Sequence, residues 1–319
     1  MRFCLAVVIT LLAGAAIAQK SEFPTRPVRI VIGFTPGGTP DITARLIGAQ
    51  LSDALGQPVV IENRPGAGGT IGAKLVADAN PDGHTLLSVS ASHVLQPSIY
   101  AKLPYDTIRD FAGITRTSTA CYLLVTAASA ETATARDLIA AAKAKPGAFI
   151  FASAGSGSGT HFAGEMFVHA AGIKAVHVPY KGIPESLNDT IAGRVQFFMS
   201  PLSGAIPLVR GGRLKPLGVS CEKRVAAIPD VPTLAESALP GFRFDTWSGI
   251  IAPARTPRPV IARLHREITR ILAQPDIAQK MTALGVEPDP TTPAEFDKLI
   301  AGQVGAMAKL AKRAGITPQ

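Results

Sequence analysis

The sequence lacks the motifs that mark most metal sites and cofactor sites. It has three cysteines in 319 residues, no C-x-x-C or H-E-x-x-H, and no Cys/His cluster with metal-ligand spacing. The phosphate loop G-x-x-x-x-G-K-[ST] is absent. The glycines at 66, 68, 69 and 72 approach the dinucleotide motif G-x-G-x-x-G, but that motif needs glycine where Ile71 stands. We therefore expect no metal and no cofactor.

Charge is also scarce. Charged residues make up 17% of the chain and hydrophobic residues 47%, which indicates a compact globular protein. The net charge is +9, yet Lys and Arg are scattered, and the densest basic stretch, residues 309–313, is short and has no interleaved aromatics. Nucleic-acid binding needs a concentrated basic face, so we exclude it. A dispersed positive charge suits attraction of a small acidic solute.

A long apolar run occurs only at the N-terminus. Arg2 precedes the run Leu5–Ile17, and residues 16–18 fit the small-x-small rule for signal cleavage. The run is shorter than the roughly 20 residues that span a bilayer. We predict a signal peptide over residues 1–18 and a soluble periplasmic product. That compartment permits a disulfide between Cys121 and Cys221, but nothing in their spacing requires one, and the pairing stays open.

Strand patterns alternate with helical patterns in two series, which predicts an α/β fold. In the first series, strands are expected at 28–32, 58–62 and 85–89, with helices at 41–55 and up to residue 78. The second series has a helix at 135–143 and strands at 149–151, 175–178, 196–199 and 214–219. A mature chain of about 300 residues is long enough for two domains. We predict two lobes, each a mostly parallel sheet flanked by helices, joined by crossovers near 119–125 and 245–251.

Three predicted turns are suited to an anion, because parallel sheets bind ligands at the carboxyl ends of their strands. Residues 35–41 and 153–161 each join a strand to a helix and contain glycines, and residues 88–93 follow a third strand with several hydroxyls. Free N–H groups at a helix N-terminus bind carboxylate or phosphate without a cationic side chain. The alternative is that these are ordinary capped turns, and it stays open here.

The sequence gives less support for a catalytic site than for an anion-binding site. Ser156 or Ser158 with His161 suggests a serine hydrolase, but G-x-S-x-G needs glycine two positions either side of the serine, and neither complies. His161 is then a residue of the helix start or the pocket wall. Asp41 either binds an amine or interacts with the helix dipole. Trp247 belongs to the core, a crossover or the pocket wall.

Several runs of sequence together resemble the receptors of tripartite tricarboxylate transporters, also called the Bug family or TctC-like receptors. They are residues 24–31 and 36–41 (PTRPVRIV, PGGTPD), 60–69 (VIENRPGAGG), 81–87 (PDGHTLL), 153–161 (SAGSGSGTH), 178–182 (VPYKG), 192–196 (AGRVQ) and 228–233 (IPDVPT). The resemblance keeps order and spacing over the mature chain.

The resemblance implies a type II-like periplasmic binding fold with a cleft between two lobes. The first lobe is expected at 19–122 and 246–319 and the second at 123–245. Such a protein is a receptor and not an enzyme. It captures a small organic carboxylate as a monomer and delivers it to a large and a small membrane subunit.

The resemblance also implies the ligand-binding residues. They are Phe34, Thr35, Gly37, Gly38, Thr39, Asp41, Ser90, Ala91, Ser92, Ser153, Gly155, Ser156, Gly157, Ser158, Thr160, His161, Tyr180, Lys181, Gly182 and Ser200. Ser200 stands where the family often has an acidic residue that could bind an amine. Its presence favours a ligand without a cationic group: a di- or tricarboxylate, or an aromatic or hydroxylated acid.

Overall fold

The computed structural model describes residues 23–313, so the predicted signal peptide lies outside the described residues. The strands are β1 (Val28–Ile32), β2 (Val59–Asn63), β3 (Thr85–Ser90), β4 (Phe111–Ala127), β5 (Phe149–Ser153), β6 (Ala175–Pro179), β7 (Phe197–Pro201), β8 (Leu214–Val219), β9 (Asp245–Pro253) and β10 (Val286–Pro288). They form a mixed sheet in the order β2-β1-β3-β9-β4-β7-β5-β6, and β8 and β10 both pair with β4.

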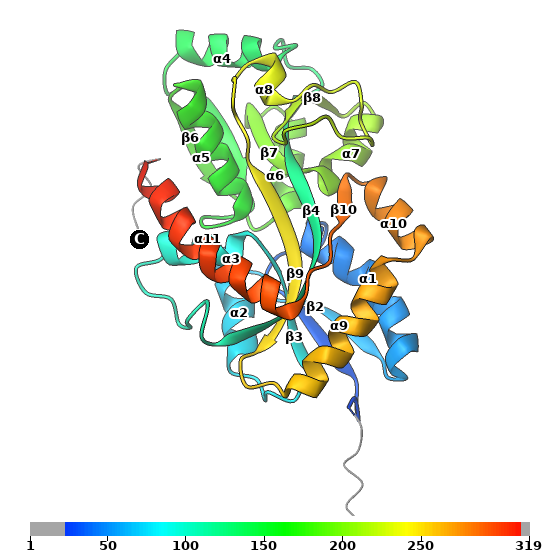
Figure 1. Ribbon diagram of the computed structural model, residues 1–319. Coiled ribbons are helices and arrows are strands. Elements are labelled where there is room, and N and C mark those ends of the chain that lie inside the picture. Colours follow the sequence, from blue (N-terminus) through cyan, green and yellow to red (C-terminus); the bar gives the residue numbers. More distant parts are fainter. Residues whose placement is uncertain (1–22, 314–319) are drawn as a thin grey trace, which may run out of the picture.

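Helices flank this sheet (Figure 1). They are α1 (Thr39–Leu55), α2 (Thr70–Ala77), α3 (Ser92–Leu95), α4 (Ala135–Ala144), α5 (Gly159–Ala171), α6 (Ile183–Ile191), α7 (Leu202–Arg210), α8 (Leu234–Ser237), α9 (Arg258–Leu272), α10 (Pro275–Thr282) and α11 (Pro293–Arg313), with short 3-10 turns η1 (Ala67–Gly69) and η2 (Gln96–Ser98). Within residues 23–313, no helix combines the length and the hydropathy needed to cross a membrane.

The first lobe is built on the parallel strands β2, β1 and β3. Helix α1 begins at Thr39, two residues earlier than predicted, because Gly38 is extended and Pro40 suits the first helical turn. It ends at Gly56, which adopts the left-handed conformation. The apolar face of α1 packs with β1 and α9 into one core cluster, with Ile47 and Ile30 fully buried. This packing fixes where the β1–α1 turn lies.

The second lobe repeats this arrangement with the parallel strands β6, β5 and β7. Its core on one side of the sheet contains Phe151, Phe167 and Phe197, all buried. On the other side, Leu123 and Leu202 belong to a separate buried cluster. Helices α5 and α6 follow β5 and β6 directly, so their N-termini lie at the carboxyl edge of this sheet.

Two long strands, β4 and β9, run from one lobe to the other side by side and antiparallel (Figure 1). They contain the predicted crossovers at 119–125 and 245–251. In the first lobe β4 pairs with β10, and in the second lobe it pairs with β7 and β8. All three pairs are antiparallel, whereas the three strands on which each lobe is built are parallel to one another. The core to which β4 contributes changes along the strand. Ala120 packs into the core of the first lobe, and Tyr122 packs into the core of the second.

Cys121 and Cys221 form a disulfide, a pairing that the sequence left open. Their Cα atoms are 5.5 Å apart, although 100 residues separate them in the chain. The bond ties crossover strand β4 to the segment that follows β8. The spacing could not reveal this, because the pairing depends on how β4 and β8 come together across the sheet.

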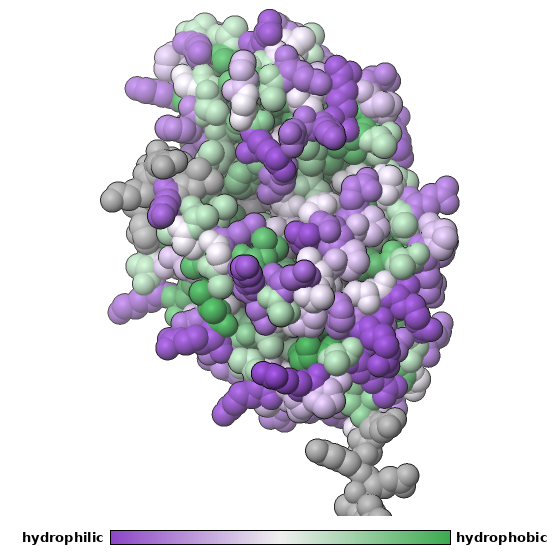
Figure 2. Space-filling view, in the orientation of Figure 1, coloured by the Kyte–Doolittle hydropathy of each residue, from purple (hydrophilic) through white to green (hydrophobic). Residues whose placement is uncertain are grey.

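The outer surface is mixed in character. On the face shown in Figure 2, hydrophilic residues surround scattered hydrophobic ones over both lobes. Apolar residues scattered in this way are normal on the surface of a folded protein. The features that point to a ligand lie between the lobes.

Candidate ligand-binding cleft

A cavity lies between the two lobes, where the turns after β1, β5 and β7 meet the crossover strands. The space there that protein atoms do not fill is about 510 Å³, which includes open solvent at the mouth of the cavity. Its lining residues are Ile32, Phe34, Thr35, Gly38, Thr39, Pro40, Asp41, Ser90, Tyr122, Ala154, Ser158, Gly159, Thr160, Ile183, Pro201, Thr246 and Ser248. Both lobes contribute, as a binding cleft between lobes requires.

The structure brings part of the predicted site to this cavity. The predicted residues that line it are Phe34, Thr35, Gly38, Thr39, Asp41, Ser90, Ser158 and Thr160. The others lie outside its lining: Gly37, Ala91, Ser92, Ser153, Gly155, Ser156, Gly157, His161, Tyr180, Lys181, Gly182 and Ser200. Most residues of this second group belong to the turns after β1, β3 and β5, but they do not line the cavity themselves.

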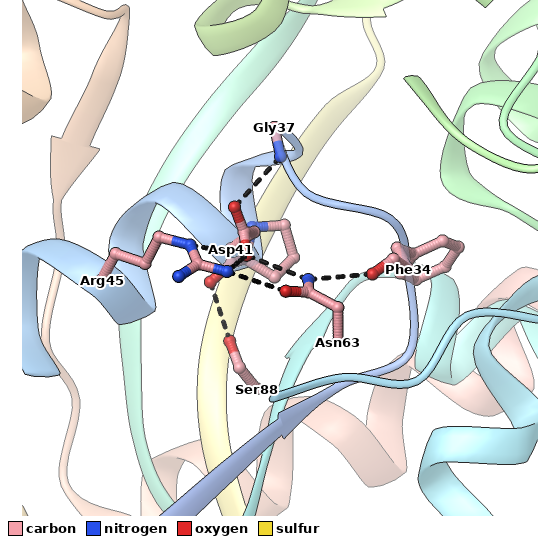
Figure 3. A network of polar contacts seen from close by, with 7 residues as sticks. Phe34, Gly37, Asp41, Arg45, Asn63 and Ser88 are labelled. Atoms are coloured by element: carbon pink, nitrogen blue, oxygen red, sulfur yellow. Dashed lines mark hydrogen bonds and ion pairs between the residues drawn. The ribbon is translucent and has the colours of Figure 1, made fainter. Parts of the chain in front are cut away.

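Asp41 holds the β1–α1 turn together (Figure 3). Its carboxylate accepts hydrogen bonds from the Gly37 amide (3.0 Å), Arg45 Nε (3.0 Å) and Asn63 Nδ2 (2.9 Å). Asn63 also donates to the carbonyl oxygen of Phe34 at 3.0 Å. The Asp41 side chain is almost fully buried, and both of its oxygens already have partners. The arrangement favours a role in fixing the turn over a role in binding an amine.

The β5–α5 turn is fixed in a similar way by hydroxyls. Ser158 caps α5, accepting a hydrogen bond from the His161 amide at 3.2 Å, and its Oγ lies 2.9 Å from Thr160 Oγ1. Thr160 Oγ1 also accepts from the Ala154 amide at 2.8 Å. Gly157 has a φ of +79°, a conformation that glycine adopts without strain. These hydrogen bonds fix the conformation of the turn, and Ser158 and Thr160 both line the cavity.

His161 is a structural neighbour of this turn. Its Nδ1 accepts a hydrogen bond from the Gly157 amide at 3.3 Å, and its ring stacks on His177 with centroids 4.0 Å apart. Burial, with the nearby His161 adding to it, lowers the pKa of His177 to about 3. The hydroxyl of Ser158 contacts the backbone of His161, not its ring. In the described part of the chain, neither Ser158 nor Ser156 shows the bond to the His161 ring that a hydrolase needs.

Other predicted residues are engaged away from the cavity. The Tyr180 hydroxyl donates to Asp189 at 2.6 Å, and Lys181 is exposed. Ser200 is fully buried on β7, and its hydroxyl donates to the carbonyl of Pro201 at 3.1 Å. Pro201 lines the cavity and Ser200 does not. In this structure the Ser200 hydroxyl therefore does not reach the cavity.

Four helices of at least nine residues, α1, α5, α6 and α7, begin at the cavity. Their first turns or caps supply lining residues from both lobes: Gly38, Ser158, Ile183 and Pro201. Helix N-termini carry partial positive charge and free N–H groups. Among the described residues that line the cavity there is no Lys, Arg or His. The geometry can hold an anion through backbone amides and hydroxyls.

The lobes touch each other around the cavity. Thr39 Oγ1 of the first lobe lies 3.1 Å from Ser203 Oγ of the second. The Tyr100 hydroxyl donates to the carbonyl of Ser156 at 3.0 Å. Gly182 is so close to Thr35 that a Cβ there would lie 1.6 Å from Thr35 Oγ1. The structure therefore describes a closed arrangement of the two lobes.

Sequence reasoning missed the part of the site that the crossover strands supply. Tyr122 on β4 and Thr246 and Ser248 on β9 line the cavity. Thr246 and Ser248 alternate around Trp247, so they share one face of the strand and Trp247 takes the other. Trp247 packs in the core, and its Nε1 donates to Gln303 at 2.7 Å. The T-W-S alternation indicates that Thr246 and Ser248 share a face of the strand, but it does not indicate that this face lines the cavity.

Comparison with known proteins agrees with this geometry. The family model described as "Tripartite tricarboxylate transporter family receptor" matches residues 43–316. The "UPF0065 protein in tcbD-tcbE intergenic region" of Pseudomonas sp. strain P51 is 37% identical over 309 residues, covering 94% of this chain and 92% of that protein.

Two solved structures share the fold. The periplasmic binding protein BugD superposes with a TM-score of 0.89 at 32% identity, covering 93% of this chain and 100% of BugD. Rpa4515 of R. palustris, solved with adipate, gives a TM-score of 0.90 at 32% identity, again covering 93% of this chain and 100% of that one. The chain belongs to the receptors of the tripartite tricarboxylate transporter family.

Proposed function

We propose that this protein is a periplasmic receptor that captures a small organic acid by its carboxylate in the cavity between the lobes. The observation that carries the proposal is the convergence of four helix N-termini on a cavity whose lining, among residues 23–313, includes no cationic side chain. Such a site suits a carboxylate, whose charge is stabilised by N–H groups and helix dipoles. The adipate bound to the similar protein Rpa4515 supports the same class of ligand.

The proposal extends to the organisation of the chain. Residues 1–18 act as a cleaved signal peptide. The first lobe comprises 19–122 and 246–319, and the second comprises 123–245. The change of core clusters along β4, from Ala120 to Tyr122, supports a division close to this boundary. The loaded receptor, a monomer without a cofactor, delivers its ligand to a large and a small membrane subunit.

A binding screen tests the function. Protein stripped of ligand by unfolding and refolding is titrated with a panel of mono-, di- and tricarboxylic, aromatic and hydroxylated acids, and melting temperature is recorded. At least one acid should raise the melting temperature. At a hundredfold excess over Kd, binding adds about 2.7 kcal/mol to the free energy of unfolding. Its methyl ester, which lacks the charge, should not. Equal effects of acid and ester would contradict carboxylate capture.

The same samples separate a receptor from a hydrolase. After incubation, mass spectrometry should recover the acid unchanged and the methyl ester uncleaved. Cleavage that is lost in Ser158→Ala would instead support a serine hydrolase using Ser158 and His161.

A further inference from the structure

Ser248 is a buried hydroxyl without a partner. It lies on β9, lines the cavity, and its side chain is 1% exposed, yet its Oγ makes no hydrogen bond. Leaving a buried polar group unpaired costs about 1–3 kcal/mol. Such groups are rare in folded proteins and call for an explanation. A ligand oxygen in the cavity would supply the missing partner.

Ser248 does not stand alone. Ser90 on β3 lies directly opposite it, and directly opposed residues of paired strands project from the same face. Thr246, two residues earlier on β9, shares that face. We call Ser90, Thr246 and Ser248 the hydroxyl floor, and all three line the cavity. Because β9 is paired on both sides, with β3 and β4, its backbone amides serve the sheet, and the side-chain hydroxyls remain for a ligand.

The Ser90 hydroxyl and Thr246 have neighbours within the protein. Ser90 Oγ lies 2.8 Å from Ser92 Oγ. Burial raises the pKa of the Tyr122 hydroxyl, and the neighbouring Thr246 side chain offsets part of that rise. Of the three floor residues, Ser248 is the one with a fully buried hydroxyl that has no partner among the described residues. It is the floor group best placed to bind a ligand; Thr35 Oγ1, in the β1–α1 turn, is another buried and unpartnered hydroxyl of the lining.

The floor carries no charge. In the described lining, the one charged side chain is Asp41, which is negative. A second carboxylate at the floor would be buried without a cation, at a cost of several kcal/mol. An uncharged hydroxyl or carbonyl oxygen pairs with Ser248 without that cost, because a serine hydroxyl both donates and accepts.

We propose that the hydroxyl floor is a second subsite, in which Ser248 binds an uncharged oxygen at the end of the ligand away from its carboxylate. This rests on the proposed function, since the carboxylate must occupy the helix N-termini. It defines the ligand as an acid that carries a hydroxyl or carbonyl group at some distance from its single carboxylate.

Matched acids test this inference. Stripped protein is titrated calorimetrically with the unsubstituted monocarboxylate, the ω-hydroxy acid and the dicarboxylate of four, five and six carbons: for six carbons, hexanoate, 6-hydroxyhexanoate and adipate. At the chain length bound most tightly, the ω-hydroxy acid should bind at least about tenfold more tightly than the other two. Tightest binding of the dicarboxylate or of the unsubstituted acid would overturn the second subsite alone. Binding of none of these acids would also overturn the second subsite as stated, while the proposed function is decided separately by the broader panel of acids described above.

Ser248→Ala assigns the effect to the residue. Since Ser248 Oγ has no partner, the empty variant should melt at the same temperature as the parent or higher, while the preference for the ω-hydroxy acid disappears. Ser98→Ala is the matched control, because Ser98 is also buried and unpaired but does not line the cavity. The control should keep the preference. A preference that survives in Ser248→Ala, or is lost equally in Ser98→Ala, would overturn the assignment.

Discussion

Asp41 lies in the wall of the cavity, yet its contacts serve the turn. A buried carboxylate at a helix start is stabilised by the helix dipole, and here it also receives the Gly37, Arg45 and Asn63 donors (Figure 3). We infer that Asp41 affects a ligand indirectly, by positioning the backbone of residues 34–39. A substitution at Asp41 tests this separation of roles.

We expect Asp41→Ala to lower the free energy of unfolding by about 3 kcal/mol, because it leaves buried donors unpaired and removes hydrogen bonds to a charged group. Binding of the acid should weaken as the turn loosens. Urea denaturation and calorimetric titration measure the two effects. Asp78→Ala is the control: its ion pair with Lys74 is exposed, so the change should stay below about 1 kcal/mol. An unfolding free energy unchanged in Asp41→Ala would contradict the role in the turn.

At the level of elements, the strand-to-helix turns could be predicted because their signals are local. Alternating strand and helix patterns, glycines and a cap such as Ser158 all lie within a few residues of each other. Tyr122, Thr246 and Ser248 reach the cavity only through the register of β4 and β9, which join distant segments. Cys121 and Cys221 depend on the same long-range pairing, so the sequence left both features undetermined.

Two glycines of these turns differ in the room that they leave for a side chain. Gly38 has a φ of −81°, and a Cβ there would meet Pro40 and Ile183 no closer than 3.8 Å, so it fits without strain. Gly157 has a φ of +79°, and its Cβ would lie 2.9 Å from the Tyr100 ring. The two positions are both in binding turns, but only Gly38 accepts a side chain in ordinary contact.

We expect Gly38→Val to fold with nearly unchanged stability and to bind the acid at least about tenfold more weakly, because its branches enter the cavity. Gly157→Val should lose about 1–2 kcal/mol of stability as well, owing to the left-handed backbone. Urea denaturation followed by calorimetry separates the cases. A folded Gly38→Val protein with full affinity would remove the β1–α1 turn from the site.

On the scale of the whole molecule, the contacts between lobes define the closed arrangement. Gly182 has an extended backbone that any residue can adopt, yet a Cβ there would overlap Thr35 of the opposite lobe. A side chain at this position obstructs closure and leaves each lobe intact.

Gly182→Ala should therefore melt close to the parent when empty and bind the acid at least about tenfold more weakly, since the lobes cannot meet around it. Gly302→Ala on α11 is the control, because nothing lies within 4 Å of the added Cβ. Calorimetric titration of both variants gives the comparison. Parental affinity in Gly182→Ala would show that closure at Thr35 contributes nothing to capture.

Small-angle X-ray scattering tests most directly whether the acid is captured between the lobes. The stripped protein and the protein saturated with a stabilising acid are measured in the same buffer. Groups held by both lobes favour the closed state, so the radius of gyration should fall when the acid binds, and it should not fall with the methyl ester. An unchanged radius of gyration, with the acid shown by calorimetry to be bound, would contradict capture by closure.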